Sequence, residues 1–521
     1  MPDKPVAVLP LWAAIVTALA SGPIMDAGFP DISVWPMTFV GIALMLIALR
    51  GRRSWSAFLV GFLGGFAFYL THISWASLFL GPVPMLALSF LESLFVALGA
   101  LAITLAYRWL PRAFGAGWGA TLGLAIVVAG LWTAREAWMS VWPYGGFSWG
   151  RVALSQAESP LAPLFPWIGV SGVSFTIVLV VALALAAAEY SWRHYSALPL
   201  DARAQHVSRA LRTAFVPVAV FALMLNVPTW QATLDSTLRV GAVQGNGKAA
   251  YFDERERGDL LTAQLTATEP LYGQDLDLVV WPEGGTDVSP LSNSYAASAF
   301  DYVVEQAGAP LISGDITERD GKIFNSQLLW MPGEGVVDIY DKRHPIPFGE
   351  YVPNREFWAQ FAPDLIGLIA RDYSIGTTDM VFDVNGVTVG VNICFDIVDD
   401  QILTESVEQG AQVIIASSNN ADFGMTDESA QQLAMARIRA LELGRSVVNI
   451  STVGLSAIIA PDGTTIAEVP WYTAATMVED VPLSTSITPA VVWGREIEWL
   501  VSGLGLGALI VAGLAGRRKN A

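Results

Sequence analysis

Eight long apolar stretches restrict the folds open to this sequence more than any other feature. A helix of about 20 apolar residues crosses the roughly 30 Å hydrocarbon core of a bilayer, and several of the eight stretches are shorter than that. The chain has 521 residues, of which 53% are hydrophobic and only 15% charged. We therefore predict an α-helical membrane bundle. The predicted spans are Val6–Met25, Ile32–Leu49, Trp55–Leu70, Val83–Tyr107, Trp118–Trp132, Trp167–Ala188, Ala214–Trp230 and Trp499–Leu514.

Basic residues beside the spans predict the orientation of the chain, because Lys and Arg collect in the cytoplasmic loops of membrane proteins. The loops after spans one and three contain neither residue, whereas basic clusters follow spans two, four, six and eight. We expect both termini in the cytoplasm and the segment between spans seven and eight outside. The clusters are Arg50, Arg52 and Arg53; Arg108 and Arg112; Arg193, Arg203, Arg209 and Arg212; and Arg517, Arg518 and Lys519.

The segment between spans seven and eight differs from the rest, because apolar strands alternate there with polar helices. Strands that are apolar on both faces indicate sheets covered by helices, hence an α/β domain. We expect three parts: a bundle over residues 1–230, an α/β domain over 238–490 and a last helix over 499–514. The predicted strands begin at Leu238, Leu276, Ala309, Ser326, Gly335, Gly386, Ala411, Ser446 and Leu455.

Composition and motif content exclude several classes of function. The net charge is −18 and the pI is near 4.6, which argues against binding to nucleic acid. The single cysteine, Cys394, rules out an intramolecular disulfide, and the four scattered histidines, without a CxxC or HExxH motif, suggest no metal site. Neither common glycine-rich phosphate loop is present, so no nucleotide or other cofactor is expected.

Three reactive residues each directly follow a predicted strand: Glu283, Lys342 and Cys394. Taken singly, they would be a turn residue, a solvated lysine and a buried core cysteine. Taken together they predict a site, because open α/β sheets place ligands beyond the ends of their strands. A nucleophilic cysteine needs a group that removes its proton and a cation that stabilises the oxyanion. The three residues supply these functions.

The motifs around these residues resemble a known family. Glu283 in WPEGG, Lys342 in YDKRHPIPFGEYVP and Cys394 in NICFD resemble the Glu-Lys-Cys triad of the nitrilase, or carbon-nitrogen hydrolase, superfamily. HPIPFGEYVP, SNNADFG and QLAMARIRALELGR resemble its membrane branch, the apolipoprotein N-acyltransferases. The resemblance covers nearly the whole chain. It implies eight spans, with a nitrilase-like α-β-β-α sandwich between the seventh and the eighth.

The resemblance also implies a role for each matching residue. Glu283 would be the general base, Lys342 the oxyanion stabiliser and Cys394 the nucleophile. Glu350, in PFGEY, would orient Lys342. Glu442, in RALELGR, would brace the site from a distance.

Four further residues are expected to contact the substrate: Phe348, Trp358, Phe395 and Asp396. The chain departs from the family pattern here, because Phe395-Asp396 follows the cysteine where Tyr-Glu is usual. SNNADFG lacks the usual tryptophan, and the two glycines of WPEGG replace a more usual Thr-Ala. These departures leave the triad intact and affect the expected shape of the pocket.

The implied reaction is a two-step acyl transfer in a bacterial plasma membrane. Cys394 would take an acyl chain from a phospholipid as a thioester. The α-amino group of the diacylglyceryl-cysteine of an apolipoprotein would then accept it. The expected partners are therefore a phospholipid, a lipoprotein and the membrane, with no metal or cofactor.

The stretch REFWAQFAPDLIGLIA, which follows Glu350, is open to two interpretations. An apolar face that is interrupted by Pro363 contains Trp358, Phe361, Leu365, Ile366 and Leu368. This face can belong to a core helix. It can equally belong to a lid that dips into lipid, as amphipathic segments do.

Two other functions fit parts of the sequence. A membrane-anchored nitrilase-type amidase would use the same triad, but it needs only one span. A transporter or sensor would place ionisable residues throughout the bundle, and the predicted spans hold almost none. Glu92, in span four, is one exception, and it suits a functional group or a helix-bridging hydrogen bond equally well.

Overall fold

The computed structural model describes residues 7–115, 117–196 and 203–518. The chain divides into two compact units. The helical unit comprises Met1–Ser74, Met85–Thr229 and Val492–Ala521, and the α/β unit comprises Trp75–Pro84 and Trp230–Val491. Each unit is described here by itself.

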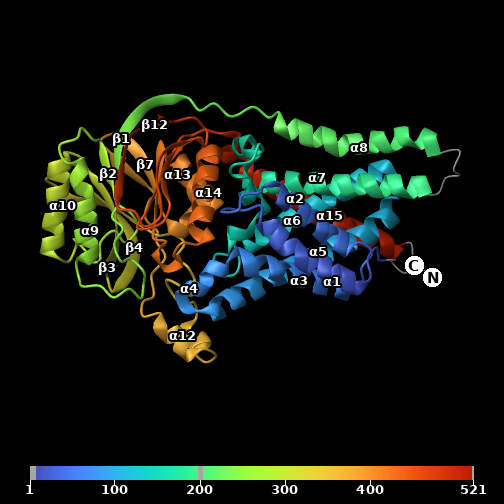
Figure 1. Cartoon of the computed structure of the whole chain (residues 1–521), viewed down its shortest axis with the longest axis horizontal. Helices are drawn as coiled ribbons and strands as arrows, with labels where there is room; N and C mark the ends of the chain where they lie inside the picture. The colour runs from blue at the N-terminus through green and yellow to red at the C-terminus, as the bar shows by residue number, and fades with distance from the viewer. Residues whose placement is uncertain (1–6, 116, 197–202, 519–521) are drawn as a thin grey trace. The chain divides into compact units, whose positions relative to one another are not determined.

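Apolar helices make up the helical unit (Figure 1). Five are long and apolar enough to cross a membrane, namely α3, α5, α6, α7 and α15, and three shorter apolar helices occur in α1, α2 and α8 among the described residues. The count of eight spans therefore stays a prediction. The bounds are α1 Leu11–Asp26, α2 Pro36–Leu49, α3 Ser54–His72, α5 Pro82–Phe114, α6 Trp118–Met139, α7 Phe165–Ser196, α8 Arg203–Leu225 and α15 Pro489–Arg518.

Several sequence features used for the orientation have no described side chains. Arg193, Arg203, Arg209, Arg212, Arg517 and Arg518 lie in helices whose side chains are outside the described part, and Lys519 lies beyond it. Helix α8 ends at Leu225, earlier than the predicted end at Trp230. The difference has a local cause, because Pro228 follows closely and the residue before a proline disfavours the helical conformation.

The C-terminal helix α15 packs closely on α6 through two glycines. A Cβ atom on Gly130 would lie 2.4 Å from the carbonyl oxygen of Val501, and one on Gly505 would lie 2.7 Å from the backbone of Gly130. Only residues without a side chain allow this approach, which is a common device in membrane helix packing. The α6–α15 contact joins a segment near residue 500 to the N-terminal bundle.

The bundle buries more ionisable groups than the predicted spans suggested. Helix α6 continues past the predicted end at Trp132 to Met139 and thereby includes Arg135 and Glu136. Glu136 is 1% exposed and accepts hydrogen bonds from the Trp132 indole at 2.8 Å and from the Val152 backbone at 3.2 Å. Glu92 is also 1% exposed. Arg135 and Glu136 therefore join Glu92 among the ionisable residues of the bundle helices, because the predicted span ended earlier than α6 does.

Two six-stranded sheets form the α/β unit, in the orders β12-β1-β2-β3-β4-β5 and β11-β10-β9-β8-β7-β6. In the first sheet β1, β2 and β3 are parallel, and in the second β7, β8 and β9 are parallel. The bounds are β1 Leu234–Gln244, β2 Leu278–Val280, β3 Leu311–Arg319, β4 Lys322–Met331, β5 Gly335–Asp341, β6 Val381–Val384, β7 Val387–Ile393, β8 Val413–Ser418, β9 Ser446–Ser451, β10 Ser456–Ile459, β11 Thr465–Val469 and β12 Ala475–Ser484.

Helices cover the outer face of each sheet (Figure 1). Helices α9 (Asp259–Thr268) and α10 (Ser294–Ala307) lie on the first sheet, and α13 (Asp400–Glu408) and α14 (Asp427–Leu443) lie on the second. Buried aliphatic side chains of both sheets form one core between them, including Val240 and Val280 of the first sheet and Val391 and Ile415 of the second. This arrangement confirms the predicted α-β-β-α sandwich.

Candidate active site

The three predicted reactive residues follow the ends of three strands. Glu283 comes shortly after β2, Lys342 directly after β5 and Cys394 directly after β7. Strands β2 and β5 run in the same direction, since β2 and β3 are parallel and β4 is antiparallel to both β3 and β5. Glu283 and Lys342 therefore leave the same edge of the first sheet. Cys394 joins them from the second sheet across the shared core.

Two carboxylates surround the ammonium group of Lys342. Its Nζ atom lies 2.8 Å from Glu350 Oε2 and 3.6 Å from Glu283 Oε1. The Asn325 side-chain amide donates to both carboxylates, at 2.6 Å to Glu283 and 2.8 Å to Glu350. The Ile346 backbone N–H donates to Glu350 Oε2 at 2.7 Å. We call Glu283, Lys342, Glu350 and Cys394 the strand-end cluster.

Burial and charge together set the protonation of this cluster. Lys342 is 1% exposed and Glu283 is 8% exposed. Burial alone would lower the pKa of Lys342, but Glu350 and Glu283 outweigh it and raise the pKa well above its usual range. Burial raises the pKa of Glu283, and the Lys342 ammonium partly opposes that rise. A permanently charged lysine therefore stands beside a carboxylate that is a stronger base than one in water.

The backbone at Cys394 is in a conformation that is unusual for a residue with a side chain. Its φ is +51°, in the left-handed region that disfavours a Cβ atom. Asp396 holds this turn, because its carboxylate accepts hydrogen bonds from the Ile393 backbone at 3.1 Å, the Tyr340 hydroxyl at 2.8 Å and the His344 backbone at 2.9 Å. Strain of this kind is typical of active sites. Here it holds the Cys394 side chain in one orientation.

The thiol of Cys394 is neutral at rest. Burial raises its pKa well above the usual range, Glu283 adds to the rise, and Lys342 opposes it. The cluster already holds two carboxylates and one ammonium, so a thiolate would add a second net negative charge. Removal of the proton must therefore accompany attack on a substrate, with Glu283 as the group that receives it.

A close backbone approach fixes the position of Glu283. A Cβ atom on Gly314, in β3, would lie 2.6 Å from the Glu283 Cα atom and 2.5 Å from the Pro282 carbonyl oxygen. The other carboxylate oxygen of Glu283 accepts the Asn419 backbone N–H at 2.8 Å. Gly314 and Asn325 were not identified from the sequence, and Asn419 was noted only as part of the SNNADFG motif, without a role. In β4, Asn325 is followed by Ser326 and Gln327, so no local signal distinguished it.

A buried polar network continues from Asn419 to Glu428. The neighbouring Asn420 donates its side-chain amide to Glu428 at 2.8 Å and to Gln432 at 2.6 Å. Glu428 is 2% exposed, and burial raises its pKa to about 8 despite the hydrogen bond from Asn420. Glu428 thus holds, through Asn420, the turn whose N–H group binds Glu283. The sequence analysis did not identify Glu428, because acidic residues are common in the first turn of a helix, here α14.

Glu442 is connected to the turn after Cys394 through Arg439. It pairs with Arg439, whose guanidinium also donates to the carbonyl oxygens of Ile397 and Val398 at 2.8 and 2.9 Å. These carbonyls belong to the short helical turn that begins at Cys394. The structure thus places Glu442 where it can brace that turn through Arg439.

The four residues predicted to contact the substrate lie in two parts of the α/β unit. Asp396 is fully buried and Phe395 is 5% exposed, both in the turn after Cys394. Phe348, with φ +61°, stacks its ring edge-to-face on Trp358 at 5.4 Å. Trp358 ends α11 (Arg355–Trp358), which precedes α12 (Pro363–Leu368).

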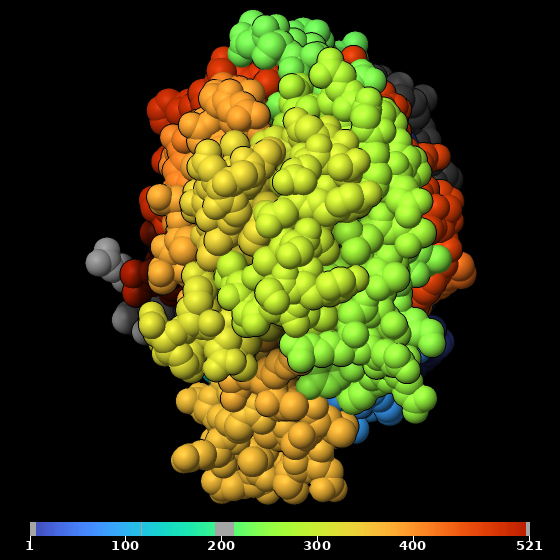
Figure 2. Space-filling model, turned by 90° about the vertical axis from the view of Figure 1, so that its left-hand side faces the viewer, coloured from blue at the N-terminus to red at the C-terminus, as the bar shows by residue number. Residues whose placement is uncertain are grey.

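Residues 352–369, which we call the lobe, project from the rest of the α/β unit (Figure 2, gold, lower edge). Its own core consists of Val352, Ile366 and Ile369, packed against partly buried neighbours that include Phe348 and Trp358. Phe357, Phe361 and Leu368 are 52%, 70% and 46% exposed. The stretch therefore combines both interpretations, since one side is a small core and the other presents apolar side chains outward.

A segment from the N-terminal half belongs to the α/β unit. Trp75 donates from its indole to Gln431 at 3.2 Å and contacts the Phe423 ring at 4.9 Å. Phe79, in α4 (Ser77–Leu80), contacts Tyr251. The segment lies within the predicted range 1–230, and nothing in its composition signals this packing.

The arrangement suits acyl transfer through a thiol. It offers a nucleophile, a buried base and an ammonium group. The Lys342 ammonium is held between Glu350 and Glu283, a position from which it can stabilise an oxyanion that forms at Cys394. Among the described residues, no group of three or more His, Cys, Asp or Glu side chains could hold a metal ion.

Comparisons with known proteins address the identity of the chain. Among solved structures it is similar to an amidase from Nesterenkonia sp., with 16% identity and a TM-score of 0.37, over 49% of this chain and 94% of that one. Two apolipoprotein N-acyltransferases are similar over nearly its whole length. The Mycolicibacterium smegmatis protein is 32% identical over 97% of this chain and 86% of its own length. The Azotobacter vinelandii protein is 30% identical over 98% and 96%.

Two family models also match the chain. The apolipoprotein N-acyltransferase N-terminal domain matches residues 21–183, and the carbon-nitrogen hydrolase domain matches residues 239–488. Together they cover the helical unit from α1 into α7 and the sandwich that holds the strand-end cluster. The chain belongs to the apolipoprotein N-acyltransferase family.

Proposed function

We propose that the protein transfers an acyl chain from a membrane phospholipid to the α-amino group of the diacylglyceryl-cysteine of an apolipoprotein, through a thioester on Cys394. The observation that carries the proposal is the burial of a single thiol beside a raised-pKa carboxylate and a buried ammonium. Membership of the family supplies the class of acceptor, a lipoprotein, and the apolar helices support its location in a membrane.

In the first half of the proposed reaction, Glu283 removes the Cys394 proton as the sulfur attacks the ester carbonyl of the phospholipid. The carbonyl oxygen becomes an oxyanion, which the Lys342 ammonium stabilises. When the intermediate collapses, the C–O bond to the glycerol breaks and Glu283 returns the proton to that oxygen. A lysophospholipid leaves, and the acyl chain remains on sulfur.

In the second half, the amine of the lipoprotein attacks the thioester carbonyl. Glu283 accepts a proton from the attacking nitrogen, and Lys342 again stabilises the oxyanion. The C–S bond then breaks, the sulfur regains its proton from Glu283, and an amide is released. Water must be excluded between the halves, because it would hydrolyse the thioester.

We propose that the lobe admits the acyl chains. Phe357 and Phe361 point apolar surface away from the small lobe core, and surface of this kind inserts favourably at a lipid boundary. The phospholipid donor would reach Cys394 beside the rings of Phe348 and Trp358. In this arrangement the α/β unit faces outward from a bacterial plasma membrane and both termini are cytoplasmic, as the basic clusters indicate.

The function is tested with purified protein, phospholipid vesicles and a synthetic diacylglyceryl-cysteine peptide. Mass spectrometry should find one added acyl group on the peptide and an equal amount of lysophospholipid, with Cys394→Ala inactive. Without peptide, the enzyme itself should carry one acyl group that neutral hydroxylamine removes. A thiol that stays unmodified during turnover would contradict the thioester. Release of a small acid from amides, with no peptide acylation, would instead favour the amidase alternative.

A further inference from the structure

The side chain of Tyr251, in the loop after β1, connects the lobe to a distant part of the α/β unit. Its hydroxyl donates to the Leu368 carbonyl oxygen at 3.2 Å and accepts the Ala370 backbone N–H at 3.1 Å. Leu368 is the last residue of α12, and the last carbonyl groups of a helix have no partner within that helix. The Tyr251 hydroxyl therefore binds the chain at the point where the lobe ends.

The loop that carries Tyr251 is fixed to the segment that binds Glu283. The Tyr251 backbone N–H donates to Asp422 Oδ1 at 2.7 Å, and the Asn419 side-chain amide donates to the Ala249 carbonyl oxygen at 3.0 Å. The backbone N–H of the same Asn419 donates to Glu283 at 2.8 Å. A continuous set of hydrogen bonds therefore runs from the lobe through Tyr251 to the carboxylate that we propose as the base.

Aromatic packing holds the Tyr251 ring. Phe79 of α4 contacts it edge-to-face with 5.7 Å between the ring centres, and Phe252 contacts it in the same way at 4.9 Å. From α4, Leu80 also packs against the core of the lobe. Tyr251 is still 38% exposed. Because the ring is held on two sides, the hydroxyl is kept at one position relative to the lobe.

The polar contacts within the lobe have a different effect. Arg355 pairs with Asp372 at 2.6 Å and donates to the carbonyl oxygens of Ile366 and Ile369 at 3.1 and 3.0 Å. These contacts join the two ends of the lobe to each other. The Tyr251 hydroxyl instead joins the lobe to a loop distant in the sequence, so its removal leaves the lobe itself intact.

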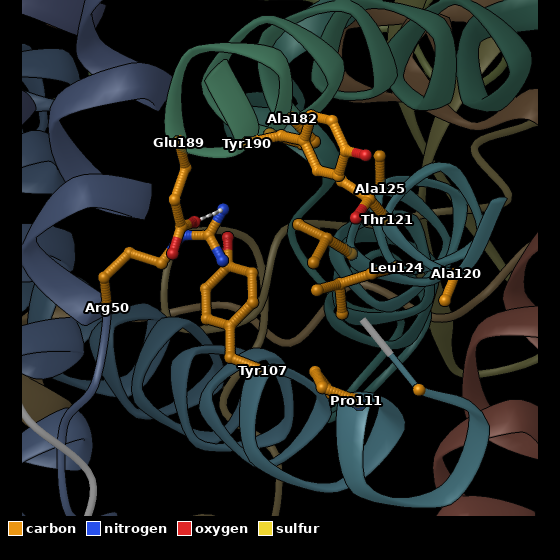
Figure 3. Close-up of a pocket in the computed structure, with 13 residues that line it drawn as sticks. Arg50, Tyr107, Pro111, Ala120, Thr121, Leu124, Ala125, Ala182, Glu189 and Tyr190 are labelled. Atoms are coloured by element: carbon orange, nitrogen blue, oxygen red, sulfur yellow. Dashed lines mark ion pairs between the residues drawn. The ribbon is translucent and has the colours of Figure 1, made fainter. Parts of the chain in front are cut away.

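The donor needs a path to Cys394, and the cavity in the helical unit does not supply one. This cavity has a volume of about 240 Å³ and is lined by parts of α5, α6 and α7 (Figure 3). All of its lining residues belong to the helical unit, and none of them is part of the lobe or of the strand-end cluster. The lobe, whose exposed rings we propose meet lipid, is the better candidate for that path.

We propose that Tyr251 is a positioning residue for the phospholipid donor, because its hydroxyl keeps the lobe where an acyl chain can pass to Cys394. This inference rests on the proposed role of the lobe. When the lobe leaves that position for part of the time, the apparent affinity for the donor falls by the fraction of molecules that remain competent. The reaction of a bound donor does not change. Loss of the hydroxyl should therefore appear in KM and not in kcat.

The alternative is that the hydroxyl only satisfies the end of α12 and contributes to stability. Tyr251→Phe would then lower the melting temperature and leave the KM for the donor unchanged. The substitution suits the question, because it removes the hydroxyl and keeps both the ring and the backbone contact with Asp422.

Hydrogen exchange of the full chain in detergent, without donor, tests the link itself. In Tyr251→Phe the peptides that cover residues 363–370 should exchange roughly fivefold faster, the scale of one hydrogen bond between neutral groups. Peptides that cover residues 419–423 should not change, since their contacts with the Tyr251 loop are kept. Tyr295→Phe, which removes a hydroxyl from a 66% exposed tyrosine of α10, should match the wild type throughout.

Kinetics with phospholipid vesicles test the consequence for the donor. The KM of Tyr251→Phe for phospholipid should rise about fivefold with kcat unchanged, and Tyr295→Phe should change neither. When the same substitution is made in a chain that already carries Phe357→Ser and Phe361→Ser, it should raise KM less than about twofold. The lobe then contributes little to donor binding, so its position matters less.

Three results would overturn the proposal: unchanged exchange in the lobe, a loss confined to kcat, or an equal increase in KM with and without the lobe substitutions. A wild type that transfers no acyl chain would contradict the proposed function. In that case the exchange measurement alone would decide whether the Tyr251 hydroxyl holds the lobe.

Discussion

In the strand-end cluster no charged side chain is more than 14% exposed and each has several partners, whereas in the lobe three buried apolar residues support a surface of exposed ones. Removing one partner from a buried ion pair costs about 3–5 kcal/mol. A segment with few buried contacts opens at far lower free energy. The two regions therefore differ in how tightly they hold their side chains in position. The sandwich holds the groups of the reaction at fixed positions, and the lobe, which we propose contacts lipid, is weakly packed.

The largest effect is expected from Lys342→Arg. The variant keeps the charge, but a planar guanidinium does not fit the point that the ammonium occupies between Glu350 and Glu283. We expect acyl transfer to fall by on the order of 10²-fold or more, as for loss of an oxyanion donor. The loss should be equal for vesicles and for dispersed short-chain lipid, measured as lysophospholipid formed per minute. Activity within threefold of wild type would mean that Lys342 only balances charge.

The next effect concerns the buried carboxyl of Glu428. Its pKa in the folded protein is raised to about 8 from a reference of 4.5. The folded state therefore favours the protonated form, and the stability from this group is complete below about pH 4.5 and is lost as the pH rises through about 8. We expect the wild type to lose on the order of 2 kcal/mol between pH 6 and pH 8 through this group.

Thermal unfolding of Glu428→Gln measures that loss. The amide keeps an oxygen for Asn420 and cannot ionise, so the melting temperature of the variant should depend less on pH between 6 and 8. Asp364→Asn, an exposed carboxyl in the lobe, is the control and should follow the wild type. Parallel curves for all three proteins would show that Glu428 does not titrate in this range.

A smaller effect is expected in the lobe. Phe357→Ser with Phe361→Ser removes two exposed rings and leaves the Val352, Ile366 and Ile369 core intact. Transfer from vesicles should fall about 30-fold, since partial burial of each of the two Phe side chains in lipid contributes of the order of 1 kcal/mol. Transfer from dispersed short-chain lipid should change little.

The matched control for the lobe is another pair of exposed aromatic residues. Tyr295→Ser with Tyr302→Ser changes two rings of α10, which are 66% and 52% exposed, and should affect neither substrate. Equal losses on vesicles and dispersed lipid in the lobe variant, or a lower melting temperature, would favour a purely structural role for the lobe.

The smallest effect is a difference between two inactive variants. At the positive φ of Cys394, glycine relieves a strain that alanine keeps. Cys394→Gly should therefore be more stable than Cys394→Ala by about 1 kcal/mol, although glycine lowers stability at ordinary positions. Denaturant unfolding of both variants measures the difference. A less stable glycine variant would indicate that the turn held by Asp396 is unstrained.

The sandwich could be predicted because its inner strands have strong apolar runs, and the three strands that the sequence analysis missed are all at sheet edges. They are β6, β11 and β12. Strand β12 carries Glu479, Asp480 and Pro482, which suit an edge strand and lack the pattern of an inner one. Edge strands bury less apolar surface, so the sequence signal for them is weaker.

For the site, the sequence indicated which residues react but not which residues hold them. Glu283, Lys342 and Cys394 lie in motifs, and each follows a strand, so their convergence was expected. Asn325 and Gly314 act through contacts between segments distant in the sequence, and Glu428 acts through Asn420, in the turn before α14. Such contacts depend on the register of β3 with β4 and on the docking of α14, which no local pattern specifies.

The Asn325 amide limits how far mutagenesis can separate the contributions of individual residues in this site. One NH₂ group restrains the base and the counter-ion of the lysine together, so displacing either carboxylate shifts the other. Losses from single substitutions at Glu283, Asn325 and Glu350 should therefore not sum, and the double variants should be much less impaired than the product of the singles predicts. A catalytic contribution can therefore be assigned only to Glu283, Asn325 and Glu350 together. A free energy attributed to one of them alone would count the same interaction more than once.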